Sequence, residues 1–132
     1  MKLFVAAVFL VFCTMMAAQT REEQLASLSA RRWMSLCEPI ANATMDRNGN
    51  LSVSNSFESG ECFGAFEALQ VLSGLQDKGR PVLGICFPPA SLRTQQVRIF
   101  VEYGKRHPER SAEPFAYVAV AALSEAFPCR SK

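Results

Sequence analysis

Cysteines are the residues with the greatest capacity for chemistry in this chain of 132 residues. Cys37, Cys62, Cys86 and Cys129 are separated by 25, 24 and 43 positions and include no C-x-x-C pair. The only histidine is His107, so the chain lacks the closely spaced nitrogen and sulfur ligands of a zinc site. The fifth cysteine, Cys13, lies in the N-terminal leader. The even number of widely spaced cysteines that remains predicts two disulfides in an exported protein, and no metal.

Catalytic groups are scarce elsewhere. His107 is the only imidazole for acid–base chemistry, and it precedes Pro108 in a polar linker. No serine lies in a nucleophile-elbow pattern, and the cysteines are committed to disulfides. We therefore expect a protein that is not an enzyme and carries no cofactor.

The stretch Asp46-Arg47-Asn48-Gly49-Asn50 resembles the start of a calcium-binding loop. An EF-hand loop beginning at Asp46 requires glycine at its sixth position and glutamate at its twelfth. Leu51 and Phe57 occupy those positions. A polar turn is the better interpretation.

The first 18 residues have the pattern of a secretory signal peptide. Lys2 is followed by the apolar stretch Leu3–Cys13, which is too short to span a membrane, and then by small residues ending at Ala18. Cleavage near Ala18 would leave residues 19–132 as a single periplasmic domain with no membrane segment.

Charge gives little indication of a polyanionic partner. The chain has 14 Lys and Arg against 12 Asp and Glu, for a net charge of +2, and no segment concentrates the basic residues. Nucleic-acid binding is therefore not expected.

Apolar periodicity predicts helices and no clear strand. The four expected helices cover Arg21–Cys37, Gly60–Ser73, Ser91–Tyr103 and Ser111–Phe127. Pro39 is expected to end the first, Gly74 to cap the second, and Ser91 to cap the third. Modest linkers between most of them predict an all-α, up-and-down bundle, and the 22 residues Glu38–Ser59 form a polar loop.

This topology selects one of the three disulfide pairings. Cys37 closes the first helix and Cys62 opens the second, whereas Cys86 and Cys129 flank the last two helices at the other end. A helix of about 15 residues spans about 22 Å, but bridged Cα atoms lie within about 7 Å. The topology therefore predicts Cys37–Cys62 and Cys86–Cys129.

The neighbourhoods of the cysteines resemble those of a known family. The similar segments are Ser35-Leu36-Cys37, Cys62-Phe63-Gly64, Ile85-Cys86-Phe87-Pro88, Gln95, His107-Pro108-Glu109 and Ala121-Ala122-Leu123-Ser124-Glu125-Ala126-Phe127-Pro128-Cys129. Together they resemble the Tai-like periplasmic immunity proteins, which protect bacteria against amidase effectors of type VI secretion. One departure is Ala65-Phe66, where the family usually has tyrosine after Cys-x-Gly.

The resemblance implies a helical protein that binds a secreted peptidoglycan amidase, blocks its active site, and can assemble as a homodimer. Loop length and polarity favour two contact segments. The first carries Asp46, Arg47, Asn48, Asn50 and Phe57, and the second, a turn over Gln76–Pro81, carries Asp77, Lys78 and Arg80. The alternative is a periplasmic helical chaperone or stress protein without a dedicated toxin.

Overall fold

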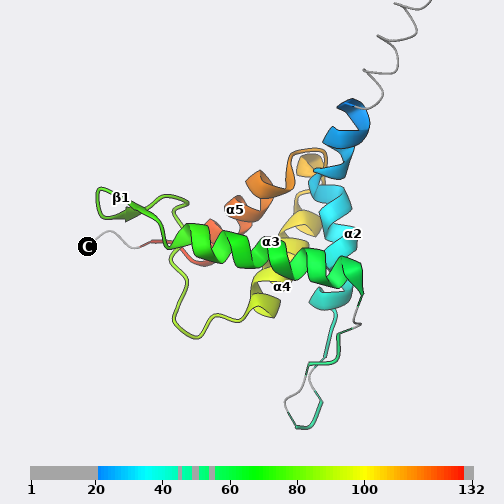
Figure 1. The fold of residues 1–132 in the computed structure, drawn as a ribbon, viewed down its shortest axis with the longest axis horizontal. Helices are drawn as coiled ribbons and strands as arrows, with labels where there is room; N and C mark the ends of the chain where they lie inside the picture. The colour runs from blue at the N-terminus through cyan, green and yellow to red at the C-terminus, as the bar shows by residue number, and fades with distance from the viewer. Residues whose placement is uncertain (1–20, 45, 49–50, 54–55, 130–132) are drawn as a thin grey trace, which may run out of the picture.

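The computed structural model describes residues 21–44, 46–48, 51–53 and 56–129 and is dominated by helices (Figure 1). The main helices are α2 (Ala30–Ala41), α3 (Phe57–Ser73), α4 (Arg93–Arg106) and α5 (Phe115–Ala126). The shorter elements are β1 (Gln76–Asp77), β2 (Arg80–Pro81) and a 3-10 turn, η1 (Pro108–Arg110). The prediction of an all-α fold with four main helices is confirmed. None of the helices among the described residues is long and apolar enough to cross a membrane.

Helix α4 packs against each of the other three main helices, and α3 runs across α2 in the view of Figure 1. One aromatic ring from each of α3, α4 and α5 meets at the centre. The ring centroids of Phe66, Phe100 and Phe115 lie 5.2–5.8 Å apart in pairs, and Trp33 of α2 stacks on Phe115 at 4.3 Å. Edge-to-face and offset contacts of this kind stabilise a core beyond simple burial. Phe66, Phe100 and Phe115 are thus core residues, whereas Tyr117 of α5 is exposed.

The first predicted helix begins at Arg21 in a helical segment, but it is interrupted at Leu28 and Ser29, and its second part ends later than predicted. A new helix, α2, begins after Ser29, whose hydroxyl accepts a hydrogen bond from the backbone N–H of Arg32. The backbone of Ser29 pairs with Pro114, and the N–H of Ala30 donates to the carbonyl of Glu113 at 2.8 Å. These contacts with a distant segment, which local sequence does not reveal, separate α2 from the exposed helical residues 21–27.

The other end of α2 passes through Pro39 and finishes at Ala41. Proline removes its own N–H donor and its ring crowds the carbonyl four residues earlier, so a helix continues past it only where packing holds the next turn. Ile40 is fully buried, and the side chain of Arg98 donates to the carbonyl of Ala41 at 3.1 Å and to that of Ala43 at 3.3 Å. Packing and this cap carry the helix one turn beyond Cys37.

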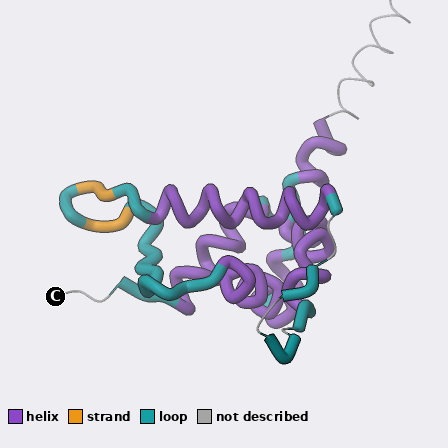
Figure 2. The backbone as a smooth tube through the Cα atoms, turned by 60° about the horizontal axis from the view of Figure 1, so that its bottom comes forward, coloured by secondary structure: helices purple, strands orange, loops and turns teal. Residues whose placement is uncertain are grey.

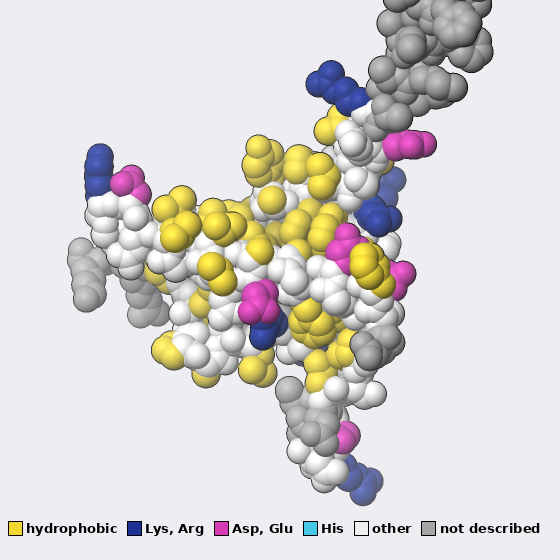
Figure 3. All heavy atoms as spheres, in the orientation of Figure 1, with side chains coloured by type: hydrophobic (Ala, Val, Ile, Leu, Met, Phe, Trp, Pro, Cys, Tyr) yellow, Lys and Arg dark blue, Asp and Glu magenta, His cyan; other side chains and the backbone are white. Residues whose placement is uncertain are grey.

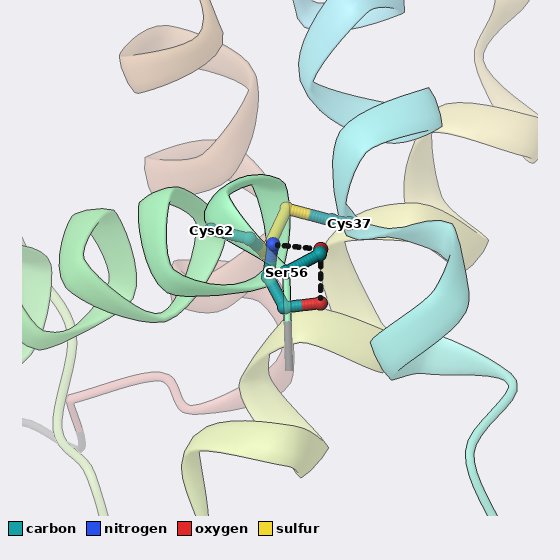
Figure 4. Close-up of a disulfide and its surroundings, with 4 residues drawn as sticks. Cys37, Ser56 and Cys62 are labelled. Carbon is teal, nitrogen blue, oxygen red and sulfur yellow. Dashed lines mark hydrogen bonds between the residues drawn. A yellow bond between two sulfur atoms is a disulfide. The ribbon is translucent and has the colours of Figure 1, made fainter. Parts of the chain in front are cut away.

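Helix α3 begins three residues before the predicted Gly60. Ser56 is its N-cap, with its hydroxyl accepting from the backbone N–H of Ser59 at 3.2 Å (Figure 4). The predicted inner face of Cys62, Phe66, Leu69 and Ser73 is buried, which confirms the period. Gly74 is the C-cap, as predicted.

Helix α4 differs from the prediction at both ends. Its N-cap is Leu92 rather than Ser91, whose hydroxyl instead accepts from the side chain of Gln96. Gly104 does not end the helix, which continues to Arg106. Gly104 is buried against Met34 of α2, and any Cβ there would overlap the sulfur of Met34. This glycine allows two helices to approach closely.

Helix α5 begins at Phe115 rather than at Ser111. Residues 111–114 instead pair with the start of α2, where the N–H groups of Ala30 and Arg31 donate to the carbonyls of Glu113 and Ser111. The apolar stripe of Phe115, Val118, Ala122 and Leu123 in α5 is buried as predicted, whereas Ala126 is exposed.

The prediction of no strand was wrong for one short hairpin. Strands β1 and β2 pair antiparallel, with Gln76 opposite Pro81 and Asp77 opposite Arg80. The connection after α2 is also shorter than expected, covering residues 42–56, because α2 ends later and α3 begins earlier.

Candidate functional site

The hairpin is a preorganised projection at the C-terminal end of α3 (Figure 2). Its two central residues, Lys78 and Gly79, have φ of 50° and 76°, as a type I′ turn requires. The N–H of Val82 donates to the carbonyl of Leu75 at 2.9 Å and closes the base of the hairpin. The predicted contact residues Asp77, Lys78 and Arg80 are therefore exposed on a turn of defined shape.

One side of the hairpin is concave. Asp77, Lys78, Arg80, Pro81 and Val82 line an open hollow of about 370 Å³. Three of these five side chains are charged, and the side chain of Val82 is exposed. Such a surface suits contact with a mixed polar and apolar surface of another protein better than enclosure of a small molecule.

The chain that follows the hairpin is fixed to the end of α5. The disulfide Cys86–Cys129 joins them, with Cα atoms 5.0 Å apart, and the N–H of Cys86 donates to the carbonyl of Phe127 at 2.9 Å. Ile85 pairs with Pro128 in an isolated β-bridge. The second disulfide, Cys37–Cys62, joins α2 to α3 with Cα atoms 5.5 Å apart, so the predicted pairing is confirmed.

The loop between α2 and α3 is the other predicted contact segment. The Asp46 carboxylate accepts from the backbone N–H of Asn48 at 2.8 Å, which makes the polar turn expected there. Asp46, Arg47 and Asn48 are exposed, whereas Asn50 lies outside the described residues. Sequence reasoning missed Arg98, which fixes the start of this loop from α4, because nothing in the sequence relates an α4 arginine to the carbonyls of residues 41 and 43.

The structure does not bring the predicted contact residues into a single cluster. Phe57 begins α3 and is 83% exposed, whereas the hairpin follows the other end of this helix of 17 residues. At about 1.5 Å per residue, these two ends lie about 25 Å apart. The candidate site therefore consists of two surfaces joined by α3 (Figure 1).

The outward side of α3 carries two glycines and Val71, with the ion pair of Glu67 with Arg93 between them. Gly60 and Gly64 are exposed, and a Cβ on either would meet nothing within 4 Å, so the fold itself does not require glycine there. Val71 is 67% exposed on the same side. Figure 3 shows hydrophobic side chains gathered over α3 and the elements beside it. This face connects the hairpin to Phe57 without a charged barrier at the glycines.

A charged cluster at the end of α4 has a structural role. Arg110 donates to both carboxylate oxygens of Glu113, at 2.7 and 3.0 Å, and to the hydroxyl of Tyr103 at 2.8 Å. The hydrogen bonds from Arg110 lower the pKa of Glu113 below its ordinary value of 4.5, and those to Glu113 and Tyr103 raise the pKa of Arg110. The cluster fixes η1 beside the segment that pairs with Ser29.

His107 belongs to the same region. Its ring lies against that of Tyr103, with centroids 4.3 Å apart, and its Nδ1 is 3.0 Å from the carboxylate of Glu109. A backbone hydrogen bond, followed by that with His107, lowers the pKa of Glu109. Across the described part of the chain, no three His, Cys, Asp or Glu residues gather where they could hold a metal ion.

Comparison with known proteins identifies one family. The family model described as Rap1a immunity proteins matches residues 29–129. No curated protein and no solved structure gives a significant match. The matched segment begins at the N-cap of α2 and ends at the last disulfide cysteine, so it covers every main helix, both bridges and the hairpin. The chain therefore belongs to the Rap1a immunity proteins, a family of type VI secretion immunity proteins.

Proposed function

We propose that this protein binds a type VI secreted peptidoglycan amidase and inhibits it by occluding its active site. Membership of the Rap1a immunity family is the observation that carries the proposal. Immunity by direct binding requires no catalytic group in the inhibitor. It requires a stable surface whose ordering costs are met during folding.

The hairpin is our first choice for the element that enters the amidase cleft. Its turn geometry is set by two positive φ angles, and both of its flanks are attached to packed elements, namely α3 and the Cys86–Cys129 bridge. A narrow turn of this kind fits into a cleft with little loss of backbone entropy. Asp77, Lys78 and Arg80 would supply charge complementarity.

The Asp46–Phe57 segment and the outer face of α3 would add contacts beside the cleft. Phe57 is a large exposed aromatic residue, of the type enriched at binding hot spots. The open backbone at Gly60 and Gly64 would allow a partner to approach α3 closely.

The proposed working compartment is the periplasm, reached by cleavage of residues 1–18 near Ala18. Proteins of this family are typically periplasmic. Two disulfides fit an oxidising compartment. A homodimer is also part of the proposal, because Val71, Leu72, Leu75 and Tyr117 leave apolar surface exposed.

The direct test is inhibition of candidate type VI peptidoglycan amidases, measured by their hydrolysis of peptidoglycan peptides. We expect inhibition to be complete at a molar ratio of about one binding site of this protein per amidase molecule. Lys78→Asn removes the charge but keeps a residue that tolerates positive φ, whereas Gly79→Val retains the charges and disrupts the turn. Gly79→Val should weaken binding at least about tenfold, or ~1.4 kcal/mol, and Lys78→Asn by less.

Arg32→Glu is the matched control, because Arg32 is an exposed cation on α2, away from both contact segments. If Gly79→Val inhibited as well as the natural protein did, the hairpin would not be the inserting element. If the protein bound no amidase but prevented aggregation of unrelated unfolded proteins, the chaperone alternative would replace the proposal.

A further inference from the structure

The two disulfides differ sharply in their access to solvent. Cys37 and Cys62 are both 0% exposed, and their bridge belongs to the hydrophobic core between α2 and α3 (Figure 4). Cys86 is exposed and Cys129 is half-buried, outside the buried core. A thiolate in solution can therefore approach the second bridge in the folded protein, but not the first.

The two bridges also differ in which parts of the protein must move before a thiolate can reach them. Attack on Cys37–Cys62 requires separation of two packed helices, which is a large opening of the structure. Cys86 and Cys129 lie in segments outside the helices, and noncovalent contacts also join these two segments. They are the Cys86–Phe127 hydrogen bond, the Ile85–Pro128 bridge and the Phe87–Phe127 ring contact at 5.2 Å.

We infer that Cys86–Cys129 is a site of thiol–disulfide exchange in the folded protein, and that its reaction partner is a dithiol. The first thiolate of the partner attacks the sulfur of Cys86, the Cys86–Cys129 bond breaks, and its electron pair leaves on the sulfur of Cys129. The second thiolate of the partner then attacks the mixed disulfide and releases Cys86. Two electrons and two protons pass to the bridge, and the partner becomes a disulfide.

Reduction at this site removes a covalent restraint from the hairpin. On the α3 side the hairpin continues directly from Gly74, and on the other side Cys86 is the nearest covalent anchor to another part of the chain. The reduced protein keeps its helices and its Cys37–Cys62 bridge but holds the hairpin less firmly. This consequence rests on the proposed function, because it affects amidase binding only if the hairpin makes the contact.

The test exposes the oxidised, folded protein to dithiothreitol, stops the reaction with acid, and alkylates the free thiols with N-ethylmaleimide. Peptide mass mapping then gives the rate at which each cysteine becomes free, while circular dichroism follows the helices. We expect Cys86 and Cys129 to be freed at least about tenfold faster than Cys37 and Cys62, with no loss of helical signal. Release of all four thiols together, or of Cys37 and Cys62 first, would overturn the inference.

Two variants separate exchange from unfolding. With Cys37→Ala and Cys62→Ala, the remaining bridge should still be reduced quickly. With Cys86→Ala and Cys129→Ala, reduction should slow to the rate at which the core opens. If either double variant fails to fold, the reduction rates measured on the natural protein alone test the inference.

An inhibition assay separates this inference from the proposed function. Protein alkylated only at Cys86 and Cys129 should inhibit a type VI amidase less than the oxidised protein does. Equal inhibition by both forms would overturn the role of the bridge in holding the hairpin. If neither form binds the amidase, the proposed function fails, while selective reduction of the bridge still stands on the mapping data.

Discussion

Two helical glycines meet opposite surroundings. A Cβ at Gly104 would overlap Met34 of the neighbouring helix, whereas a Cβ at Gly64 would project into open space. The same residue type therefore serves packing within the molecule at one position and leaves backbone accessible at the other.

Substitution should distinguish these two roles. Gly64→Ala should stabilise the protein by about 0.5–1 kcal/mol, because alanine favours the helix and nothing obstructs its methyl group. Gly104→Val should destabilise it by about 1–3 kcal/mol, because α4 must move away from α2 or Met34 must leave its position. Urea unfolding measures both, and a loss of stability in Gly64→Ala would contradict the first expectation.

The Arg110–Glu113 pair predicts a particular dependence of stability on pH. The folded state lowers the pKa of Glu113, so the unfolded state binds more protons between the two pKa values. The stabilisation is therefore present above the ordinary carboxyl pKa and is lost as pH falls through the lowered one. Comparing the unfolding midpoints of the natural protein and Glu113→Gln should give a difference at neutral pH that narrows as the pH falls below the ordinary carboxyl pKa of 4.5. Glu22→Gln, in an exposed segment, is the control.

Helix boundaries show how far local sequence determines the elements. The inner faces of α3 and α5 follow from apolar spacing, and the disulfide pairing follows from the order of the helices. The separation of α2 from residues 21–27 does not, because it depends on pairing with Pro114 and Glu113 more than 80 positions away. The turn over Gln76–Pro81 was predicted, but its two paired strands were missed, because Lys78-Gly79 lacks the asparagine or aspartate that usually marks a type I′ turn.

The candidate site was predictable to a similar degree. The sequence already indicated that the charged residues of the two contact segments are exposed. The helical pattern between the two segments also implied that they lie at opposite ends of one helix. The outer face of α3 was not apparent, because its glycines and Val71 lie within a segment that is apolar on several sides.

The N-cap of α3 offers a test of how a single side chain fixes the start of a helix. Ser56→Ala should lower the free energy of unfolding by about 1 kcal/mol, because the N–H of Ser59 loses its acceptor at the start of the helix. Ser52→Ala, at an exposed position of the preceding loop, should change it by much less. Equal effects of the two substitutions in thermal unfolding would show that Ser56 does not act as a cap.

For the whole molecule, the family match and the packed structure share an N-terminal boundary. The match begins at Ser29, Ala30 is the first fully buried residue, and residues 21–28 are exposed. The carbonyl of Leu28 still accepts from the N–H of Phe115 at 2.7 Å. We therefore expect the independently folding domain to start at Leu28.

Shortened chains should locate this boundary. Starting the chain at Leu28 should leave the unfolding free energy within about 0.5 kcal/mol of that of a chain starting at Arg21. Starting it at Arg31 should destabilise it clearly, because Ala30 and the pairing of Ser29 are lost. A large loss already on removal of residues 21–27 would place those residues within the folded unit.

The disulfide pairing also determines how the molecule would come apart. Each bridge joins cysteines that are neighbours in sequence, so the chain carries two separate covalent rings, one closed before the hairpin and one after it. The tip at Lys78 lies on the single stretch of chain between these rings, and the Lys78–Gly79 bond is a cleavage site for trypsin-like proteases, whereas Pro81 protects the bond after Arg80. One cut there would leave two pieces held together by packing alone, and denaturation without any reductant would separate them.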